Sequence, residues 1–330
     1  MQRSHSRIAK ALSGVLLGIA IGLSPTPAPS QGYPSRTVRI VVPLSPGSQT
    51  DLLARMLAQK MAAGWDQPVI VENHPGGAGQ LAGKVLVSAA PDGHTLMLHS
   101  DGYAVSAALY GARLPYDTLR DFARVSLVAT SPSVLVVSPR LNVRSVAELI
   151  ALAKTKPGGL TFGSAGIGGG IHFTGEMFRL ATGIDAVHVP FKGMPEAITE
   201  TMTGRLDYTF SSLQPAWPYL RDGKLLAIAV GSPQRSPVLP DVPTVAEGGV
   251  PGFGYELWFG VFAPARTPAS VVQQINRELV RSVSLPEVKD RLLAQGVLPR
   301  GSTAEEFDAF VRAEIAKLSE VVKTAGIKVD

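Results

Sequence analysis

The sequence contains no cysteine among its 330 residues. This absence excludes disulfide bonds, thiolate metal sites and a lipid attached to an amino-terminal cysteine. A chain of this length can bury about 75% of its unfolded surface, so a hydrophobic core can hold the fold without cross-links. The composition, 45% hydrophobic and 17% charged, is that of a globular protein, and the length allows two domains.

Clustered charge is also missing. Lysine and arginine are scattered along the chain, with no basic stripe, so we expect no nucleic-acid partner. The spacing of His, Asp and Glu matches no common metal site, and the sequence has no H-E-x-x-H motif. We therefore expect neither a bound metal nor a cofactor.

Two segments come close to motifs for catalysis or nucleotide binding, but each differs from its consensus at one position. The run GSAG at residues 163–166 is no G-x-S-x-G nucleophile elbow, because Phe162 stands where the first glycine belongs. The dinucleotide fingerprint that begins at residue 166 has Ile171 in place of its third glycine. We expect a binding protein and not an enzyme. The less favoured alternative is an exported serine hydrolase with Ser164 as nucleophile and His172 as base.

The apolar run nearest to membrane-spanning length lies in the first thirty residues. Arg3, Arg7 and Lys10 precede an apolar core at residues 11–23, and small residues at 28–30 permit cleavage before residue 31. This pattern predicts a secretory signal peptide over residues 1–30. An uncleaved membrane anchor would need a longer apolar run. We expect an exported protein, located in the periplasm if the cell has two membranes.

Beyond this leader, short apolar strands alternate with amphipathic helices, which predicts an α/β fold. Strands at residues 125–129 and 134–137, separated by a polar Thr-Ser-Pro-Ser run, are expected to leave one lobe and enter the next. A buried strand at residues 257–263 is expected to return to the first lobe. We therefore assign residues 33–130 plus 250–330 to lobe 1 and residues 131–249 to lobe 2.

Two loops of small residues each join a strand to a helix. The first is SPGSQT at residues 45–50; the second, at 163–170, contains four glycines and precedes a helix that begins near residue 172. Glycine lets a ligand approach the backbone, and the amino end of a helix carries partial positive charge. Either loop alone could be only a tight turn. As a pair they predict a cleft in which two lobes grip an anion from both sides.

Other loops are expected to reach the same edge of the first sheet. The loop at residues 74–80 and the run Ser100-Asp101-Gly102 each follow a predicted strand. In open α/β sheets, ligands lie outside the carboxyl ends of the strands. His172, at the start of the second helix, is predicted either to donate to a ligand carboxylate or to cap and pack that helix.

These segments together resemble a known family. The runs are VPLSPGSQTDLLAR, VENHPGGAGQLAG, PDGHTL, TFGSAGIGGGIHFTGEMF, VPFKGMPEAITETMTGRLDYTF, GKLLAIAV and LPDVPTVAEGGVPGF. They resemble, in order and over nearly the whole chain from residue 33, the Bug family of extracytoplasmic solute receptors of tripartite tricarboxylate transporters.

The resemblance implies a two-lobed periplasmic binding protein fold of type II-like architecture, in which each lobe is a mixed, mostly parallel sheet flanked by helices. Crossing strands would form the hinge. It also implies a small carboxylate ligand, such as a di- or tricarboxylate or an aromatic acid, and membrane permease subunits as partners. We expect a monomer. A receptor that signals to a sensor partner is the alternative role.

The motif match implies ligand contacts for part of the candidate set, and the loop argument adds the remainder. The predicted ligand-binding residues are Ser45, Gly47, Ser48, Gln49, Thr50, Asp51, Ser100, Asp101, Ser164, Ala165, Gly166, Gly168, His172 and Ser211. Relatives often carry Asp-Asn where this chain has Ser211-Ser212. We therefore hypothesise that the ligand lacks an amino group, because the acid that would meet an ammonium group is absent there.

Overall fold

The computed structural model describes residues 32–156 and 159–327, so the predicted signal peptide lies outside the described residues. The strands are β1 (Val38–Val42), β2 (Val69–Asn73), β3 (Thr95–Ser100), β4 (Phe122–Val137), β5 (Leu160–Ser164), β6 (Ala186–Pro190), β7 (Tyr208–Ser212), β8 (Leu226–Val230), β9 (Glu256–Pro264) and β10 (Leu298–Pro299). The α-helices are α1 (Gln49–Trp65), α2 (Gln80–Val87), α3 (Gly102–Tyr110), α4 (Val146–Thr155), α5 (Gly170–Thr182), α6 (Met194–Thr203), α7 (Leu213–Arg221), α8 (Ala269–Ser284), α9 (Pro286–Leu293) and α10 (Ala304–Ala325). Short 3-10 helices are η1 (Gly77–Gly79), η2 (Gly111–Arg113) and η3 (Pro139–Leu141).

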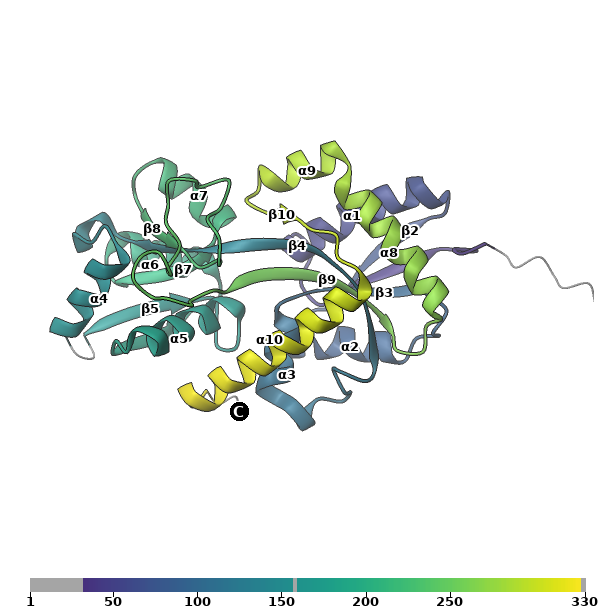
Figure 1. The fold of residues 1–330 in the computed structure, drawn as a ribbon, viewed down its shortest axis with the longest axis horizontal. Helices are drawn as coiled ribbons and strands as arrows, with labels where there is room; N and C mark the ends of the chain where they lie inside the picture. Colours follow the sequence, from purple (N-terminus) through teal and green to yellow (C-terminus); the bar gives the residue numbers. More distant parts are fainter. Residues whose placement is uncertain (1–31, 157–158, 328–330) are drawn as a thin grey trace, which may run out of the picture.

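The strands form two groups joined by the long strand β4, which pairs with strands of both, and β9 lies beside it (Figure 1). Hydrogen bonds order the sheet as β2-β1-β3-β9-β4-β7-β5-β6, with β10 and β8 also paired to β4. Within lobe 1, β1 runs parallel to β2 and β3; within lobe 2, β5 runs parallel to β6 and β7. Because parallel strands need crossover connections, helices cover both faces of each lobe.

Each lobe has a core on both faces of its strands. In lobe 1, one core packs α1, α8 and α9 against the sheet, and the other packs α2, α3 and α10. In lobe 2, α4 and α5 pack on one face, while α6 and α7 pack on the other. Helix α10 contacts α3 of lobe 1 and α5 of lobe 2, and in Figure 1 it runs alongside the crossing strands.

The prediction of two separate strands between residues 125 and 137 was wrong, because β4 is continuous through the Thr-Ser-Pro-Ser run. Pro132 is the last residue of β4 that pairs with β9, opposite Glu256. From Ser133 onward β4 pairs with β7. Proline has no N–H to donate, and it is tolerated here because the strand changes partners at this point. The assigned lobe boundary at residues 130–131 falls in this change of partners and remains a prediction.

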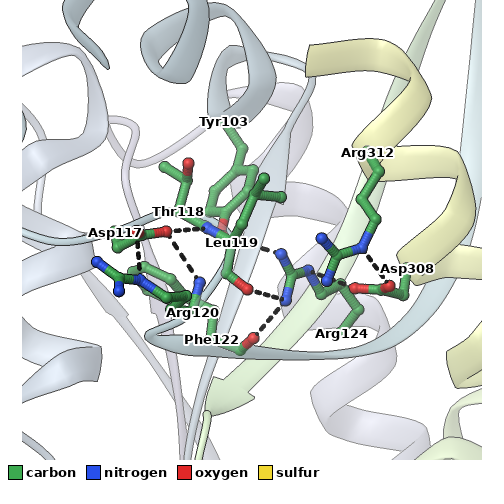
Figure 2. Close-up of polar contacts among 9 residues, drawn as sticks. All are labelled: Tyr103, Asp117, Thr118, Leu119, Arg120, Phe122, Arg124, Asp308 and Arg312. Carbon is green, nitrogen blue, oxygen red and sulfur yellow. Dashed lines mark hydrogen bonds and ion pairs between the residues drawn. The ribbon is translucent and has the colours of Figure 1, made fainter. Parts of the chain in front are cut away.

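A buried arginine ties α10 to the start of β4 (Figure 2). The guanidinium of Arg124 donates to the carbonyl oxygens of Thr118, Leu119 and Phe122, at 2.7 to 3.0 Å. Its Nε lies 3.2 Å from Asp308 Oδ1 on α10, but without hydrogen-bond alignment. Removing the guanidinium would take this buried donor from the Leu119 and Phe122 carbonyl groups, whereas Thr118 would keep its bond from Tyr103. Arg124 thus links α10 to the start of β4 in lobe 1.

Candidate functional site

A cavity of about 270 Å³ lies where the strand ends of lobe 1 meet the amino end of α5 in lobe 2. The lobe 1 wall consists of Pro43, Leu44, Gly76, Ala78, Gly79, His99, Ser100, Asp101, Gly102 and Ser106. Gly168, Gly169 and Gly170 form the lobe 2 wall. Three predicted residues, Ser100, Asp101 and Gly168, therefore lie at this cavity. The parallel pairing of β1, β2 and β3 explains why loops distant in the chain share one edge.

In the first loop, Asp51 bonds within the protein and does not line the cavity. Its carboxylate accepts from the Gly47 N–H at 2.9 Å, from Asn73 Nδ2 at 2.9 Å and from Arg55 Nε at 3.1 Å. Burial alone would raise the pKa of Asp51, but hydrogen bonds from Arg55, Gly47 and Asn73 lower it overall. The ionised Asp51 side chain on α1 thus fixes the loop by binding its backbone at Gly47. Gly47 permits this because its φ is +82°, a conformation that favours glycine.

The remaining first-loop candidates are placed around this closed turn. Ser48 is the N-cap of α1, and its Oγ accepts from Asp51 N at 3.3 Å. Gln49 Nε2 is buried without a hydrogen-bond partner among the described residues, and Thr50 is buried. Ser45 is exposed. The structure brings these residues to the end of β1 but not to the cavity wall, where Pro43 and Leu44 stand instead.

The second loop is held by serine and histidine side chains. Ser164 Oγ donates to the Gly166 carbonyl at 2.9 Å and lies 2.7 Å from His188 Nε2. The Gly168 N–H donates to His172 Nδ1 at 3.2 Å. The two imidazoles stack with centroids 4.0 Å apart. These bonds hold the loop against His188 of β6 and His172 of α5, and Ala165 remains exposed.

His188 was missed in the sequence, although it is the histidine that meets Ser164. The only available signal was its position on β6, where it pairs with Phe162 of β5. Burial lowers the pKa of His172 to about 4, and burial together with the neighbouring His172 lowers that of His188 to about 4. Both rings are therefore neutral at physiological pH. The structure does not bring together Ser164 and His172, the pair of the less favoured hydrolase alternative, because His172 bonds to the loop backbone and Ser164 meets His188.

Asp101 is the acid in the cavity wall. Its Oδ2 accepts from the Tyr255 hydroxyl at 2.8 Å, and the side chain is buried. A Cβ built on Gly170 would lie 1.8 Å from this oxygen, so the lobe 1 carboxyl group lies directly against the amino end of α5. Burial raises the pKa of Asp101 to about 6. Tyr255 was not singled out in the sequence, and Gly170 was predicted only as one of the four loop glycines, because both reach Asp101 only through the tertiary fold.

The lining residues carry no lysine or arginine. His99 donates through Nδ1 to the Ser100 carbonyl at 3.0 Å, and burial lowers its pKa to about 4, so it is neutral. An anion in this cavity would therefore depend on uncharged donors, such as backbone N–H groups and the Ser100 hydroxyl group. The first turn of α5 has such groups, since its N-cap Gly169 makes no side-chain capping bond.

Ser211 lies apart from this cavity. It is buried at the end of β7, opposite Val134, and its Oγ donates to the Ser212 carbonyl at 2.8 Å. Among residues 32–156 and 159–327, no three His, Asp or Glu side chains cluster closely enough to hold a metal ion. No helix in the same ranges is long and apolar enough to span a bilayer.

Comparison with known proteins agrees with this architecture. Residues 53–327 match the family model described as "Tripartite tricarboxylate transporter family receptor". The periplasmic binding protein BugD has 30% sequence identity and a TM-score of 0.75, covering 90% of this chain and 99% of BugD. Rpa4515 of R. palustris, solved with adipate, has 33% identity and a TM-score of 0.78, covering 90% of this chain and 99% of that protein. MatC from Rhodopseudomonas palustris, with bound malate, has 32% identity and a TM-score of 0.74, covering 88% and 100%. The expected two-lobed fold and the family resemblance are confirmed.

Proposed function

Because this chain belongs to the receptor family of tripartite tricarboxylate transporters, we propose that it is a periplasmic solute receptor that captures a small organic carboxylate between its lobes and delivers it to a tripartite tricarboxylate-type permease. The predicted signal peptide supports export. Adipate and malate in the related structures support a small dicarboxylate as the ligand class. We propose that the receptor is a monomer, that it is not an enzyme and that it needs no cofactor.

The observation that carries this proposal is the interlobe cavity. Backbone from Gly168 to Gly170 faces the strand ends of lobe 1 across about 270 Å³, a space on the scale of a small organic acid. The absence of side chains on these glycines exposes the amino end of α5 to a ligand. The rest of the proposed contact set extends from this cavity along the loops at residues 45–51 and 164–168.

The energetic argument is that backbone N–H groups can bind a carboxylate without a formal positive charge. Hydrogen bonds to a charged group contribute roughly 1.5–3 kcal/mol each, so a few of them reach the micromolar range after the cost of association. Closing the lobes excludes water and strengthens these bonds. A permease that recognises only the closed form would then distinguish loaded from empty receptors.

Purified mature protein tests the proposal directly. A thermal-shift screen against adipate, malate, citrate, benzoate, aspartate and glutamate should show stabilisation by at least one acid without an amino group. Titration calorimetry should then give a dissociation constant in the micromolar range. Micromolar aspartate or glutamate with no dicarboxylate binding would refute the hypothesis on ligand class, and no binding by any acid would refute the receptor proposal.

Transport requires its own test. Deleting the gene should abolish uptake of the identified acid in cells, and the wild-type gene should restore it. A complementing variant with Gly168→Asp, which places a side chain and a negative charge in the cavity, should fail to restore uptake. Unchanged uptake in the deletion strain would contradict delivery to a permease.

A further inference from the structure

Asp101 poses an electrostatic problem for a receptor of anions. It is the only acid among the residues that line the interlobe cavity, and no lysine or arginine lines the cavity to offset it. A carboxylate ligand bound against Gly168–Gly170 would share a small space with the Asp101 carboxyl group, whose Oδ2 lies against Gly170. Two carboxylates in one site cannot both remain ionised without a large repulsion.

Burial favours a proton on Asp101 and outweighs the hydrogen bonds from Tyr255, the Gly102 N–H and Ser100, which favour the ionised carboxylate. Glu314 on α10 adds a further negative field, only partly offset by Lys317, whose Nζ lies 3.7 Å from Glu314 Oε1. The neighbouring imidazoles, His99 on β3 and His172 on α5, are neutral because burial lowers their pKa values to about 4.

Resting on the proposed function, we propose that Asp101 carries a proton whenever a carboxylate ligand occupies the cavity, so that ligand capture takes up a proton from solvent. The proton adds to a carboxylate oxygen of Asp101, and the ligand enters in its ionised form. A neutral Asp101 can then donate a hydrogen bond to the ligand. It cannot serve as the counter-ion of an ammonium group, which agrees with a ligand that lacks an amino group.

Titration calorimetry with adipate or malate tests this coupling between pH 6.5 and 8.5. Both acids are predominantly dianionic across this range, because it lies above the region in which carboxyl groups titrate. Since burial raises the pKa of free Asp101 to about 6, the wild-type association constant should fall with rising pH, by up to about tenfold per unit. Repeating the titration in two buffers with different ionisation enthalpies should reveal net proton uptake at pH 8.5.

Asp101→Asn is the decisive variant, because an amide mimics the neutral acid and can still accept from Tyr255. It should bind the same acid with little pH dependence and without proton uptake, and at pH 8.5 it should bind more tightly than wild type. Glu314→Gln tests whether Glu314, and not Asp101, takes up the proton. This variant should retain the pH dependence of the association constant that is expected for wild type. Glu305→Gln, exposed on the first turn of α10 and outside the cavity, is the matched control and should behave like wild type.

Two results would overturn the inference alone. One is dicarboxylate binding by wild type with a flat pH profile and no proton uptake. The other is loss of binding in a folded Asp101→Asn variant at every pH, which would show that an ionised Asp101 is needed as an acceptor. Absence of binding by wild type at all pH values would instead refute the proposed function, and the inference with it.

Discussion

Replacing Gly170 with alanine should separate lobe closure from folding. Gly170 opens α5 in lobe 2, and its added Cβ would lie 1.8 Å from Asp101 Oδ2 and 3.0 Å from Leu257 Cδ2. Ordinary contact begins near 3.4 Å, so Asp101 or the lobe must move by more than 1 Å. Asp101 cannot turn away freely, because it is buried and bonded to Tyr255.

The expected loss of binding free energy follows from the contacts that the added methyl group disrupts. Breaking the bond between Tyr255 and Asp101, or holding the lobes apart at this point, should cost about 1.5–3 kcal/mol in the closed form. This corresponds to roughly 10- to 100-fold weaker adipate or malate binding. The open receptor does not bear this cost, and alanine is favoured over glycine within a helix by up to about 1 kcal/mol. The melting temperature without ligand should therefore stay the same or rise.

Calorimetry and thermal unfolding measure these two effects separately, and a helix-capping glycine outside the cavity is the matched control. A Cβ on Gly193, the N-cap of α6, would meet its nearest neighbour, Pro195 Cδ, at 3.6 Å. Its φ of −167° and ψ of 164° are also open to alanine, so Gly193→Ala should change affinity by less than about threefold. The reasoning fails if Gly170→Ala binds like wild type, or if it loses stability as much as affinity.

Three further predictions concern stability and chemistry. Arg124→Met should lower the free energy of unfolding by about 2–4 kcal/mol, because the Leu119 and Phe122 carbonyl groups lose a buried charged donor, whereas Thr118 keeps Tyr103 and Asp308 keeps Arg312; a chemical-denaturation midpoint equal to that of wild type would contradict this. Burial raises the pKa of Asp101 to about 6, so the stability that this group contributes is present below about pH 4 and is lost as the pH rises through 6. Above pH 6, Asp101→Asn should therefore be more stable than wild type by up to roughly 3 kcal/mol. Equal melting curves of the two proteins at pH 8 would refute the assignment. Ser164→Ala should weaken ligand binding by about five- to tenfold, because it frees the loop from His188, while neither form should hydrolyse p-nitrophenyl acetate; ester turnover that depends on Ser164 would revive the hydrolase alternative.

Local patterns in the chain were sufficient for the architecture. Alternating strands and helices, glycine-rich loops and the order of the family motifs predicted the α/β class, the two lobes and the returning strand β9. Helix α10 begins with a capping box, in which Thr303 and Glu306 each accept from the other's backbone N–H. These features depend on residues a few positions apart, so their physical causes are visible in the sequence. The continuous strand β4 was missed because Pro132 signals a break unless the partner strands are known.

The details of the site depended on contacts between distant segments. The sequence predicted Asp51 and Asp101 alike as ligand contacts, yet the fold surrounds Asp51 with Gly47, Arg55 and Asn73 and places Asp101 against Gly170. One carboxylate is thereby held ionised within its loop, while the other is buried in the wall of the interlobe cavity with no cation among the lining residues. The sequence by itself determined which loops carry small and acidic residues. Only the tertiary structure decided which acid lines the cavity and in which direction the pKa of each acid shifts, because the pKa of a carboxyl group is set by its neighbours in space and not by its neighbours in the chain.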